Sequence, residues 1–468
     1  MDNTKKFRGG LDPAQTLILP FSLDAWLRPD HPVRGLADII DQLDLSAIYA
    51  TYSELRGQPP YDPRMMVRII AYGYSKGLRS SRRIEQALHD DIAMRWLSRN
   101  QQPDHSVIAE FRRRHHKALG DLLVQTVQIA KSAGLVGGHD VAVDGTKFQA
   151  NASKHSAMSH GYMEEEKKRL EEAVAKALAE MEAADQRDER EGDSARADAL
   201  AADVKFKQAR LAKIREAMAA LEQRAKESAE AKEAKRKAVA EREGKAFVPK
   251  DLSQVSVDEK AQYNFTDPQS RILRGKNDDY IQGYNGQVAV DAESMIAVAA
   301  ELTIDSTDYG ALVPVVDQAA NNLGEKVPGV LADAGYFSAE NVGAMEERGI
   351  DALIPPRRIS HTEWRDQPLA EGAPPDDADA KDAMRHRIRT PEGRARYKRR
   401  QETVEPAFGN LKEVQGQRQE LLRGYAKSRS MWRFQWAVFN LKKLVKAGVS
   451  AAARMRGPEG GYTLTAPA

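Results

Sequence analysis

Two carboxylates lie where apolar runs of the sequence give way to polar residues. Asp144 follows the run VAV in VAVDGTKFQANAS (141–153), and Asp333 follows the run VLA in PGVLADAGYFSAEN (328–341). An Asp at the end of a strand often only shapes a turn. At the carboxyl ends of two neighbouring strands, however, a pair of Asp oxygens lies where α/β sheets bind ligands and suits a hard divalent cation. The pair therefore predicts a cation site if the two strands are neighbours.

The segments around these two runs predict a sheet with helices. Strand-like runs follow at YIQGYNGQVAVD (280–291) and MIAVAAELTI (295–304), and helical and strand-like segments then alternate. When 161–245 is left out, the expected order is three strands, then helix, strand, helix, strand and helix. A right-handed crossover allows the fourth strand to lie parallel to the first and beside it. Asp144 and Asp333 would then meet.

Two helical regions accompany the expected sheet domain of 137–160 and 246–450. Apolar residues recur at helical spacing through 31–136, which predicts a helical bundle. Ala, Glu, Lys and Arg dominate 161–245, which predicts two long helices folded back as an antiparallel coiled-coil hairpin, with a solvated single helix as the alternative. Residues 1–30 and 451–468 are expected to be tails, the second of them flexible.

The composition limits both the chemistry and the location of the protein. The 468 residues contain no Cys, so any metal site must use oxygen or His ligands. No run approaches the roughly 20 apolar residues that span a bilayer, and the N-terminus lacks an apolar signal core. We therefore expect a soluble, cytoplasmic protein without a membrane partner.

Basic residues are concentrated in two regions although the net charge is only +2. Lys and Arg outnumber Asp and Glu by 18 to 6 in 381–446 and by 12 to 6 in 62–117. Such concentrations are typical of proteins that bind polyanions. In the second region SKGLRSSRRIEQAL is expected to be a helix-turn-helix with Arg79, Arg82 and Arg83 near a helix start, and an ordinary basic bundle surface is the alternative. These three arginines, with Arg112 and Arg113 on a later helix, are expected to contact DNA.

The expected strand order resembles the RNase H-like α/β fold of the DDE transposases encoded by bacterial insertion sequences. In this family the first and fourth strands each present an Asp, and a later helix presents a Glu. The segment YKRRQETVEPAFGNLK is similar to the Tyr-Arg-Glu-Lys signature of the family and identifies Tyr397, Arg400, Glu405 and Lys412. The step from Arg400 to Glu405 is one residue longer than usual, and the adjacent Arg399 is an alternative for the Arg. Glu405 and Lys412 are seven residues apart and are expected on one helix face.

Further segments match the family in the expected order. In chain order they are QPPYDPRMMVRIIAYGYSKGLRSSRRIEQAL in the N-terminal domain, and DPQSRILRGKNDDYIQGYNGQVAVD, ADAGYFSAEN and GYAKSRSMWRFQWAVFNLKKL in the expected catalytic core that follows it. The resemblance implies that Asp144, Asp333 and Glu405 are catalytic and hold two Mg²⁺ or Mn²⁺ ions. It also implies that Tyr397, Arg400 and Lys412 contact DNA near the cleaved bond.

The implied activity is that of a DNA transposase, which cleaves strands at the ends of its element and joins them to a target. Its partner is double-stranded DNA at both places, which associates the protein with the nucleoid. Because two ends must be brought together, a homodimer is expected in the complex with DNA. A metal-dependent nuclease of the same fold and a DNA-binding regulator descended from a transposase are the alternatives.

Overall fold

The computed structural model describes most of the chain, namely residues 22–52, 60–188, 194–242, 244–252, 255–275, 279–358, 367–375, 377–449, 454–456 and 462–464. Most of the expected N-terminal tail, 1–21, lies outside the described residues, and helix α1 (Leu23–Trp26) lies within that tail. In the expected C-terminal tail the described residues form two short antiparallel strands, β9 (Arg454–Arg456) and β10 (Tyr462–Leu464).

A six-stranded mixed sheet lies at the centre of the molecule. Its order is β4-β5-β1-β7-β8, with β6 paired to β5. Strand β5 is antiparallel to β1, β4 and β6, whereas β7 is parallel to both β1 and β8. The prediction that the strands leading to the two aspartates are parallel neighbours is confirmed. The strands are β1 (Val141–Gln149), β4 (Arg271–Arg274), β5 (Tyr280–Asp291), β6 (Ala297–Thr303), β7 (Gly329–Ala332) and β8 (Asp351–Leu353).

Strand β1 does not end at Asp144, as the apolar run suggested, but continues to Gln149. Its parallel ladder with β7 stops at the pair Val143 and Ala332, whereas its antiparallel ladder with β5 continues through Asp144 and beyond. The long strand β5 provides hydrogen-bond partners for the backbone of the polar half of β1. From the sequence alone, this half was expected to lie beyond the end of the strand. Asp144 is therefore a residue of a paired strand, and its side-chain direction is fixed by the pleat.

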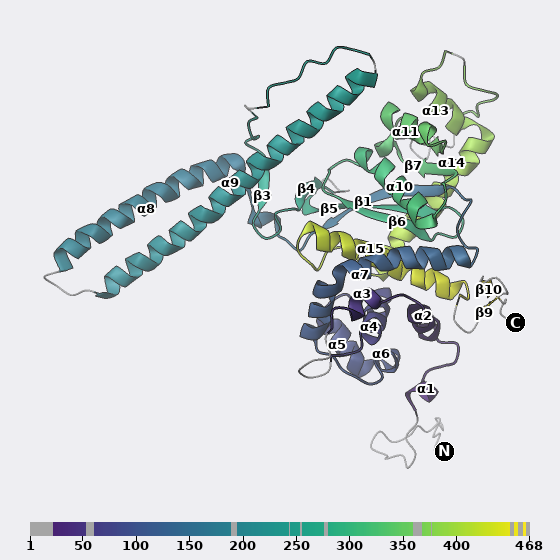
Figure 1. The fold of residues 1–468 in the computed structure, drawn as a ribbon, viewed down its shortest axis with the longest axis horizontal. Helices are drawn as coiled ribbons and strands as arrows, with labels where there is room; N and C mark the ends of the chain where they lie inside the picture. The colour runs from purple at the N-terminus through teal and green to yellow at the C-terminus, as the bar shows by residue number, and fades with distance from the viewer. Residues whose placement is uncertain are drawn as a thin grey trace, which may run out of the picture.

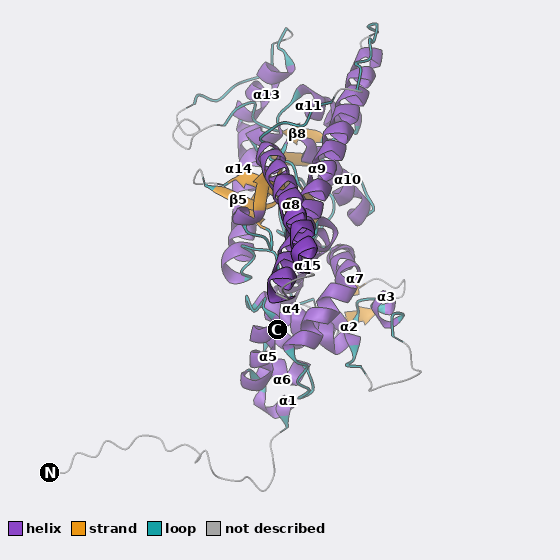
Figure 2. Ribbon diagram, turned by 90° about the vertical axis from the view of Figure 1, so that its left-hand side faces the viewer, coloured by secondary structure: helices purple, strands orange, loops and turns teal. Residues whose placement is uncertain are grey.

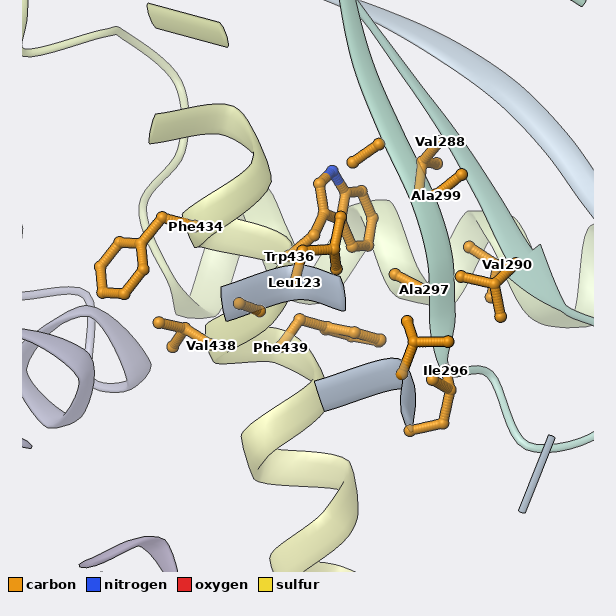
Figure 3. Packing of buried hydrophobic residues seen from close by; sticks show 14 of the residues in the cluster. Leu123, Val288, Val290, Ile296, Ala297, Ala299, Phe434, Trp436, Val438 and Phe439 are labelled. Carbon is orange, nitrogen blue, oxygen red and sulfur yellow. The ribbon is translucent and has the colours of Figure 1, made fainter. Parts of the chain in front are cut away.

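Two long helices, α7 (His105–Ser132) and α15 (Tyr425–Lys446), run side by side below the sheet in Figure 1. Figure 3 shows Trp436 and Phe439 of α15 facing strand residues such as Ala297. Trp432, one turn earlier on α15, stacks on Phe148 of β1 with the ring centroids 5.0 Å apart. The aromatic run near the end of the chain thus packs the last helix onto the sheet.

The N-terminal helices lie below α7 and α15 in Figure 1, and their buried apolar residues belong to the same continuous core as those of the sheet. The expected bundle is therefore not separated from the catalytic region by a solvent layer. Besides α1, the helices before α7 are α2 (Pro32–Asp41), α3 (Ser46–Tyr49), α4 (Pro63–Ser75), α5 (Ser81–Asp90) and α6 (Ile92–Leu97).

The region predicted as a helical hairpin consists of α8 (His160–Asp188) and α9 (Ser194–Arg242), which project from the core in Figure 1 and toward the viewer in Figure 2. The prediction of two long helices is confirmed. They pack through a small apolar cluster that includes Met163 and Ile214. Strands β2 (Ala157–Ser159) and β3 (Gln262–Asn264) pair at the base of the hairpin.

Among the described residues, the remaining α-helices follow the strands of the second half of the sheet. They are α10 (Leu312–Leu323), α11 (Ala339–Glu347), α13 (Ala380–Arg389) and α14 (Pro391–Gly409), and a π-helical turn (Asn410–Val414) follows α14. Helix α14 contacts β1 and β7, the two strands that lead to the aspartates. None of the helices in the described part of the chain combines the length and the apolar character needed to cross a membrane.

Candidate active site

Asp144 and Asp333 occupy equivalent places on adjacent parallel strands. Each follows directly after the last residue of the parallel ladder, the pair Val143 and Ala332. Each carboxylate also accepts a hydrogen bond from a nearby backbone N–H. Asp144 Oδ1 lies 2.8 Å from the nitrogen of Gly145, and Asp333 Oδ1 lies 2.8 Å from that of Gly335. Local backbone contacts and the sheet register thus fix both side chains.

Arg400 lies between the two carboxylates. Its Nη2 atom is 3.0 Å from Oδ2 of Asp144 and 3.7 Å from Oδ2 of Asp333. The guanidinium is brought there by α14, and the residue is buried. Arg399, the alternative for the signature Arg, instead extends along the surface to Glu293. Of the two arginines, the structure therefore places Arg400 at the aspartates.

A second ion-pair cluster holds α14 one turn earlier. Arg396 contacts Asp140, the residue before β1, at 3.0 Å, and it also pairs with Asp351 of β8 at 2.5 Å. Arg396 and Arg400 are four residues apart on α14 and share one face of the helix, and their partners Asp140 and Asp144 are four residues apart in the extended segment that contains β1. The two contacts fix the position of α14 along β1. The carboxylate of Asp140 thus has a structural role as the partner of Arg396.

The environment of the site changes the pKa values of its groups. Burial raises the pKa of Asp144 to about 6, and the positive charge of Arg400 opposes this change while Asp333 and Asp308 reinforce it. Burial also raises the pKa of Tyr397 to about 12. The pKa of Arg400 is raised, because its interaction with Asp144 and the other acidic groups outweighs the effect of burial. The guanidinium is therefore a permanent cation beside the aspartates.

Glu405 is not brought into contact with the two aspartates. It is exposed on α14, whereas the buried stripe of this helix includes Tyr397, Arg400 and Val404. Within the described ranges, no three side chains of His, Asp or Glu converge closely enough to hold a metal ion. Glu402, one turn before Glu405, pairs with Lys398 on the helix surface.

Lys412 lies in the π-helical turn that follows α14. Its Nζ atom is 5.9 Å from the ring centroid of Phe408. The expectation that Lys412 shares a face with Glu405 assumed a continuous α-helical period, and that period ends at Gly409. A π-helical turn has more residues per turn, so it changes the direction in which Lys412 points.

The two aspartates fit a divalent cation. Their oxygens are hard ligands, and a positively charged group already lies within 4 Å of both carboxylates. Mg²⁺ commonly takes only one or two carboxylates and keeps several waters, so two carboxylates are sufficient for a first ion.

The five arginines expected to bind DNA fall into two groups. Arg79 and Arg112 are buried: Arg79 donates to the backbone carbonyls of Gly416 and Gln419, and Arg112 donates to the carbonyl of Arg79 at 2.7 Å and to a Tyr hydroxyl. The side chain of Arg79 thus joins the N-terminal helices to the segment that follows α14, and Arg112 supports the backbone of Arg79. Arg82, Arg83 and Arg113 are exposed, and Arg113 pairs with Glu110 at 2.6 Å.

Sequence reasoning missed a third acidic residue beside the site. Asp308 accepts hydrogen bonds from Asn285 and Gln287 of β5, at 2.7 and 2.8 Å. Asn285 and Gln287 are buried amides in a strand that is otherwise largely apolar or small. The sequence does contain a signal for such a partner: Asn285 and Gln287 lie on one face of this strand, and buried amides need hydrogen-bond partners.

Comparison with known protein families agrees with this arrangement. Residues 21–114 match the model of a transposase domain (DUF772), and residues 137–441 match that of the transposase DDE domain. The second match covers more than half of the chain and includes Asp144, Asp333 and Glu405. No curated protein and no solved structure gives a match. The chain belongs to the DDE transposase family, as encoded by insertion sequences, and has its RNase H-like fold.

Proposed function

We propose that the protein binds the ends of its own insertion sequence and catalyses cation-dependent cleavage and transfer of DNA strands. The observation that carries the proposal is the placement of Asp144 and Asp333 directly after the parallel ladder of β1 and β7, with the cationic group of Arg400 between them. The family match supports the reaction class. In this proposal Asp144, Asp333 and Glu405 are the three catalytic carboxylates.

The proposed cofactors are two Mg²⁺ or Mn²⁺ ions, which when bound activate the attacking oxygen and stabilise the leaving oxygen of an in-line displacement at phosphorus. Asp144 is the more enclosed ligand, since its side chain is 18% exposed against 40% for Asp333. Asp144 and Asp333 would hold the ions, with Asp144 as the more deeply placed of the two ligands. Asp144 lies within β1 and Asp333 directly follows β7, so the sheet holds their oxygens in place before DNA arrives.

Glu405 is assigned as the third carboxylate ligand, which requires α14 to adjust locally. The helix has features that permit such an adjustment after Glu405. Pro406 has no backbone N–H, so the helical hydrogen bond to the carbonyl of Glu402 is missing. The π-helical turn that starts at Asn410 is of a kind often found at functional sites.

We assign the DNA contacts near the cleaved bond to Tyr397, Arg400 and Lys412. Arg400 would exchange its contact with the aspartates for a DNA phosphate when cations enter, because both partners then remain compensated in charge. Exposed arginines of the N-terminal helices, Arg82 and Arg83 on α5 among them, would contribute further phosphate contacts. The functional complex is a homodimer on two element ends, in the cytoplasm and at the nucleoid.

Two alternative functions would give different results in binding, nicking and joining assays. A DNA-binding regulator that has lost catalysis would bind the element's ends without nicking them. A metal-dependent nuclease of the same fold would nick DNA without joining it. Cleavage, joining and binding must therefore be measured on the same samples.

The experiment uses a labelled duplex that carries one end of the element, taken from the inverted repeat beside the coding region. Wild-type protein, Asp333→Asn and the control Asp317→Asn are compared for gel-shift affinity and for nicking with Mg²⁺ or Mn²⁺. Asp317 is a suitable control because its carboxylate pairs with Arg348 between α10 and α11. Asp333→Asn removes a negative charge that a divalent ion requires and leaves the basic surfaces unchanged.

We expect Asp333→Asn to lose nicking and joining while its DNA affinity stays within about twofold of wild type, and Asp317→Asn to behave as wild type. Binding of wild type should fall roughly a thousandfold or more between about 50 and 200 mM salt if six or more phosphates are contacted. Wild type that binds without nicking supports the regulator. Nicking by Asp333→Asn at the wild-type rate removes Asp333 from the site.

A further inference from the structure

The carboxylate of Asp308 is held by a buried set of hydrogen bonds. Tyr336 is fully buried and its hydroxyl donates to Oε1 of Gln287, and burial keeps the pKa of this hydroxyl well above its usual value. Because Tyr336 donates to the oxygen of the amide, the Nε2 group of Gln287 must point the other way, toward Asp308 at 2.8 Å. Asn285 donates to the same Oδ1 atom at 2.7 Å. The side chain of Asp308 is therefore fixed before any ligand binds.

Asp308 occupies a narrow space between the two segments that carry the catalytic aspartates. A Cβ atom added at Gly145, the residue after Asp144, would lie only 2.7 Å from Oδ1 of Asp308. A Cβ atom added at Gly335, two residues after Asp333, would lie 3.5 Å from Oδ2. Each oxygen of Asp308 thus faces a glycine next to one of the proposed ligands. At Gly145 the absence of a side chain lets a third carboxylate lie this close to the site, whereas at Gly335 a Cβ atom would make an ordinary van der Waals contact with it.

Asp308 does not cap the turn that follows it, which is the usual structural role of an Asp in this position. It precedes the short 3₁₀ turn Tyr309–Ala311, but its side chain makes no capping hydrogen bond to that turn. The neutral amide oxygen of an Asn could also accept the two amide hydrogen bonds, although more weakly than a carboxylate does. A carboxylate close to Asp144 and Asp333 instead adds like charge to the site, which is unfavourable unless a cation compensates it.

We propose that Asp308 is a positioning residue of the acidic site, whose fixed negative charge beside Asp144 and Asp333 strengthens divalent-cation binding and orders water around the cation. The proposal rests on the proposed function, since it concerns the same site. Both amides donate to Oδ1, and Oδ2 lies on the side of Gly335, where it can accept a hydrogen bond from water that enters with the cation. Asp308 acts next to the ligands and is not itself assigned as one.

The test measures Mn²⁺ binding to the full-length protein by electron paramagnetic resonance of free Mn²⁺, alone and with the duplex that carries the element's end. The variants are Asp308→Asn, Asp308→Glu, Asp144→Asn and the matched control Asp305→Asn. Asp305 lies in the same turn, but its side chain is exposed and bonds to Thr303. Melting temperatures of all variants are measured in EDTA, so that a loss of folding is separated from a loss of cation binding.

Outer-sphere partners of a metal typically contribute about 10–100-fold to its affinity, so we expect the tightest Mn²⁺ affinity to fall about 10–100-fold in Asp308→Asn. Asp308→Glu should recover part of that loss because it restores the charge, and Asp305→Asn should bind as wild type does. If Asp308→Asn does not fold, Tyr336→Phe is used instead, since it removes the donor that orients Gln287 and keeps the carboxylate; it should show a smaller loss.

The outcomes separate this proposal from the proposed function. Wild-type Mn²⁺ affinity in Asp308→Asn, together with weakened binding in Asp144→Asn, overturns the role of Asp308 and leaves the proposed function intact. Mn²⁺ binding that is the same in wild type and Asp144→Asn, with and without duplex, contradicts the proposed function itself.

Discussion

The Nη2 atom of Arg400 lies 3.0 Å from Oδ2 of Asp144, at the edge of the sheet where the parallel ladder of β1 and β7 has just ended. Both residues are largely buried, so the pair is an ion pair of the protein interior. A guanidinium in this position compensates the carboxylates as a divalent cation would. Arg400 and a metal ion should therefore compete for the same oxygens, which has measurable consequences.

Arg400→Met is expected to destabilise the metal-free protein and to tighten its binding of Mn²⁺. Removing one partner of a buried ion pair leaves an uncompensated charge and costs roughly 3 kcal/mol. The two carboxylates then lack their internal cation, so the same variant should gain more in melting temperature from Mn²⁺ than wild type does. The measurement is thermal unfolding in EDTA and in a series of Mn²⁺ concentrations.

Lys398→Met is the control for Arg400→Met, because Lys398 lies on the same helix and pairs with Glu402 at its surface. It should melt as wild type does in both conditions. An Arg400→Met protein with unchanged stability in EDTA, or with the same response to Mn²⁺ as wild type, would show that guanidinium and cation do not share the site.

Glu405→Gln is expected to abolish nicking although Glu405 makes no contact with the aspartates in this structure. If α14 brings Glu405 to the cations once DNA is bound, loss of its charge should reduce the nicking rate by at least about a hundredfold. A 1 Å misplacement of reacting groups can already cause a loss of that size, and removing a charged ligand should cost at least as much. Glu402→Gln provides a matched control, since Glu402 is exposed on the same helix three residues earlier. If Glu405→Gln and Glu402→Gln both nick at the wild-type rate, Glu405 is excluded as the third carboxylate.

The pairing of Asp351 with α14 should give the protein an acid-sensitive contribution to stability. Burial alone would raise the pKa of Asp351, but the hydrogen bonds and charges of Arg396 and Arg387 outweigh it and lower the pKa below its usual value. A lowered pKa in the folded state means that the contribution is present above the unfolded pKa of about 3.9 and is lost as the pH falls through the folded value.

Asp351→Asn should therefore lower the free energy of unfolding at pH 7 and weaken its dependence on pH below about pH 4. The side chain is 42% exposed, so solvent screening limits the loss to about 1 kcal/mol. Urea unfolding of wild type and variant at several pH values between about 3 and 7 measures both effects. A constant difference between the two proteins across this range would contradict the assignment.

The parts of the fold that depend on local pattern could be predicted, and those that depend on distant contacts could not. The order of the expected strands and helices, with a crossover that allows adjacent parallel strands and a family resemblance that implies them, led to the correct prediction that the strands before Asp144 and Asp333 are neighbours. Asp308 gave no local signal, because its importance arises from β5 residues 21 and 23 positions earlier. The length of β1 was misjudged for the same reason, since its polar half is a strand only through its pairing with β5.

The basic residues of the N-terminal helices show the same limit. Arg79 and Arg82 look alike in SKGLRSSRRIEQAL, yet Arg79 donates to backbone carbonyls 337 and 340 residues later in the chain, and Arg82 is exposed. A count of positive charges cannot tell a phosphate-binding arginine from one that joins two parts of the core. The distinction has to be measured through two different properties.

Arg79→Met and Arg82→Met should therefore separate folding stability from DNA affinity. Arg79 also lies 3.9 Å from the buried carboxylate of Glu420, so its removal leaves that charge and two carbonyls without their partner and should cost roughly 3 kcal/mol of unfolding free energy. Arg82→Met should leave stability unchanged within about 0.5 kcal/mol, the usual range for surface substitutions.

If Arg82 contacts a phosphate, the slope of log K against log salt should become less steep by about 1 in Arg82→Met, whereas the folded fraction of Arg79→Met should keep the wild-type slope. Urea unfolding and salt-dependent gel shifts on the same preparations give both quantities, and a reduced salt slope in Arg79→Met would restore Arg79 to the DNA interface.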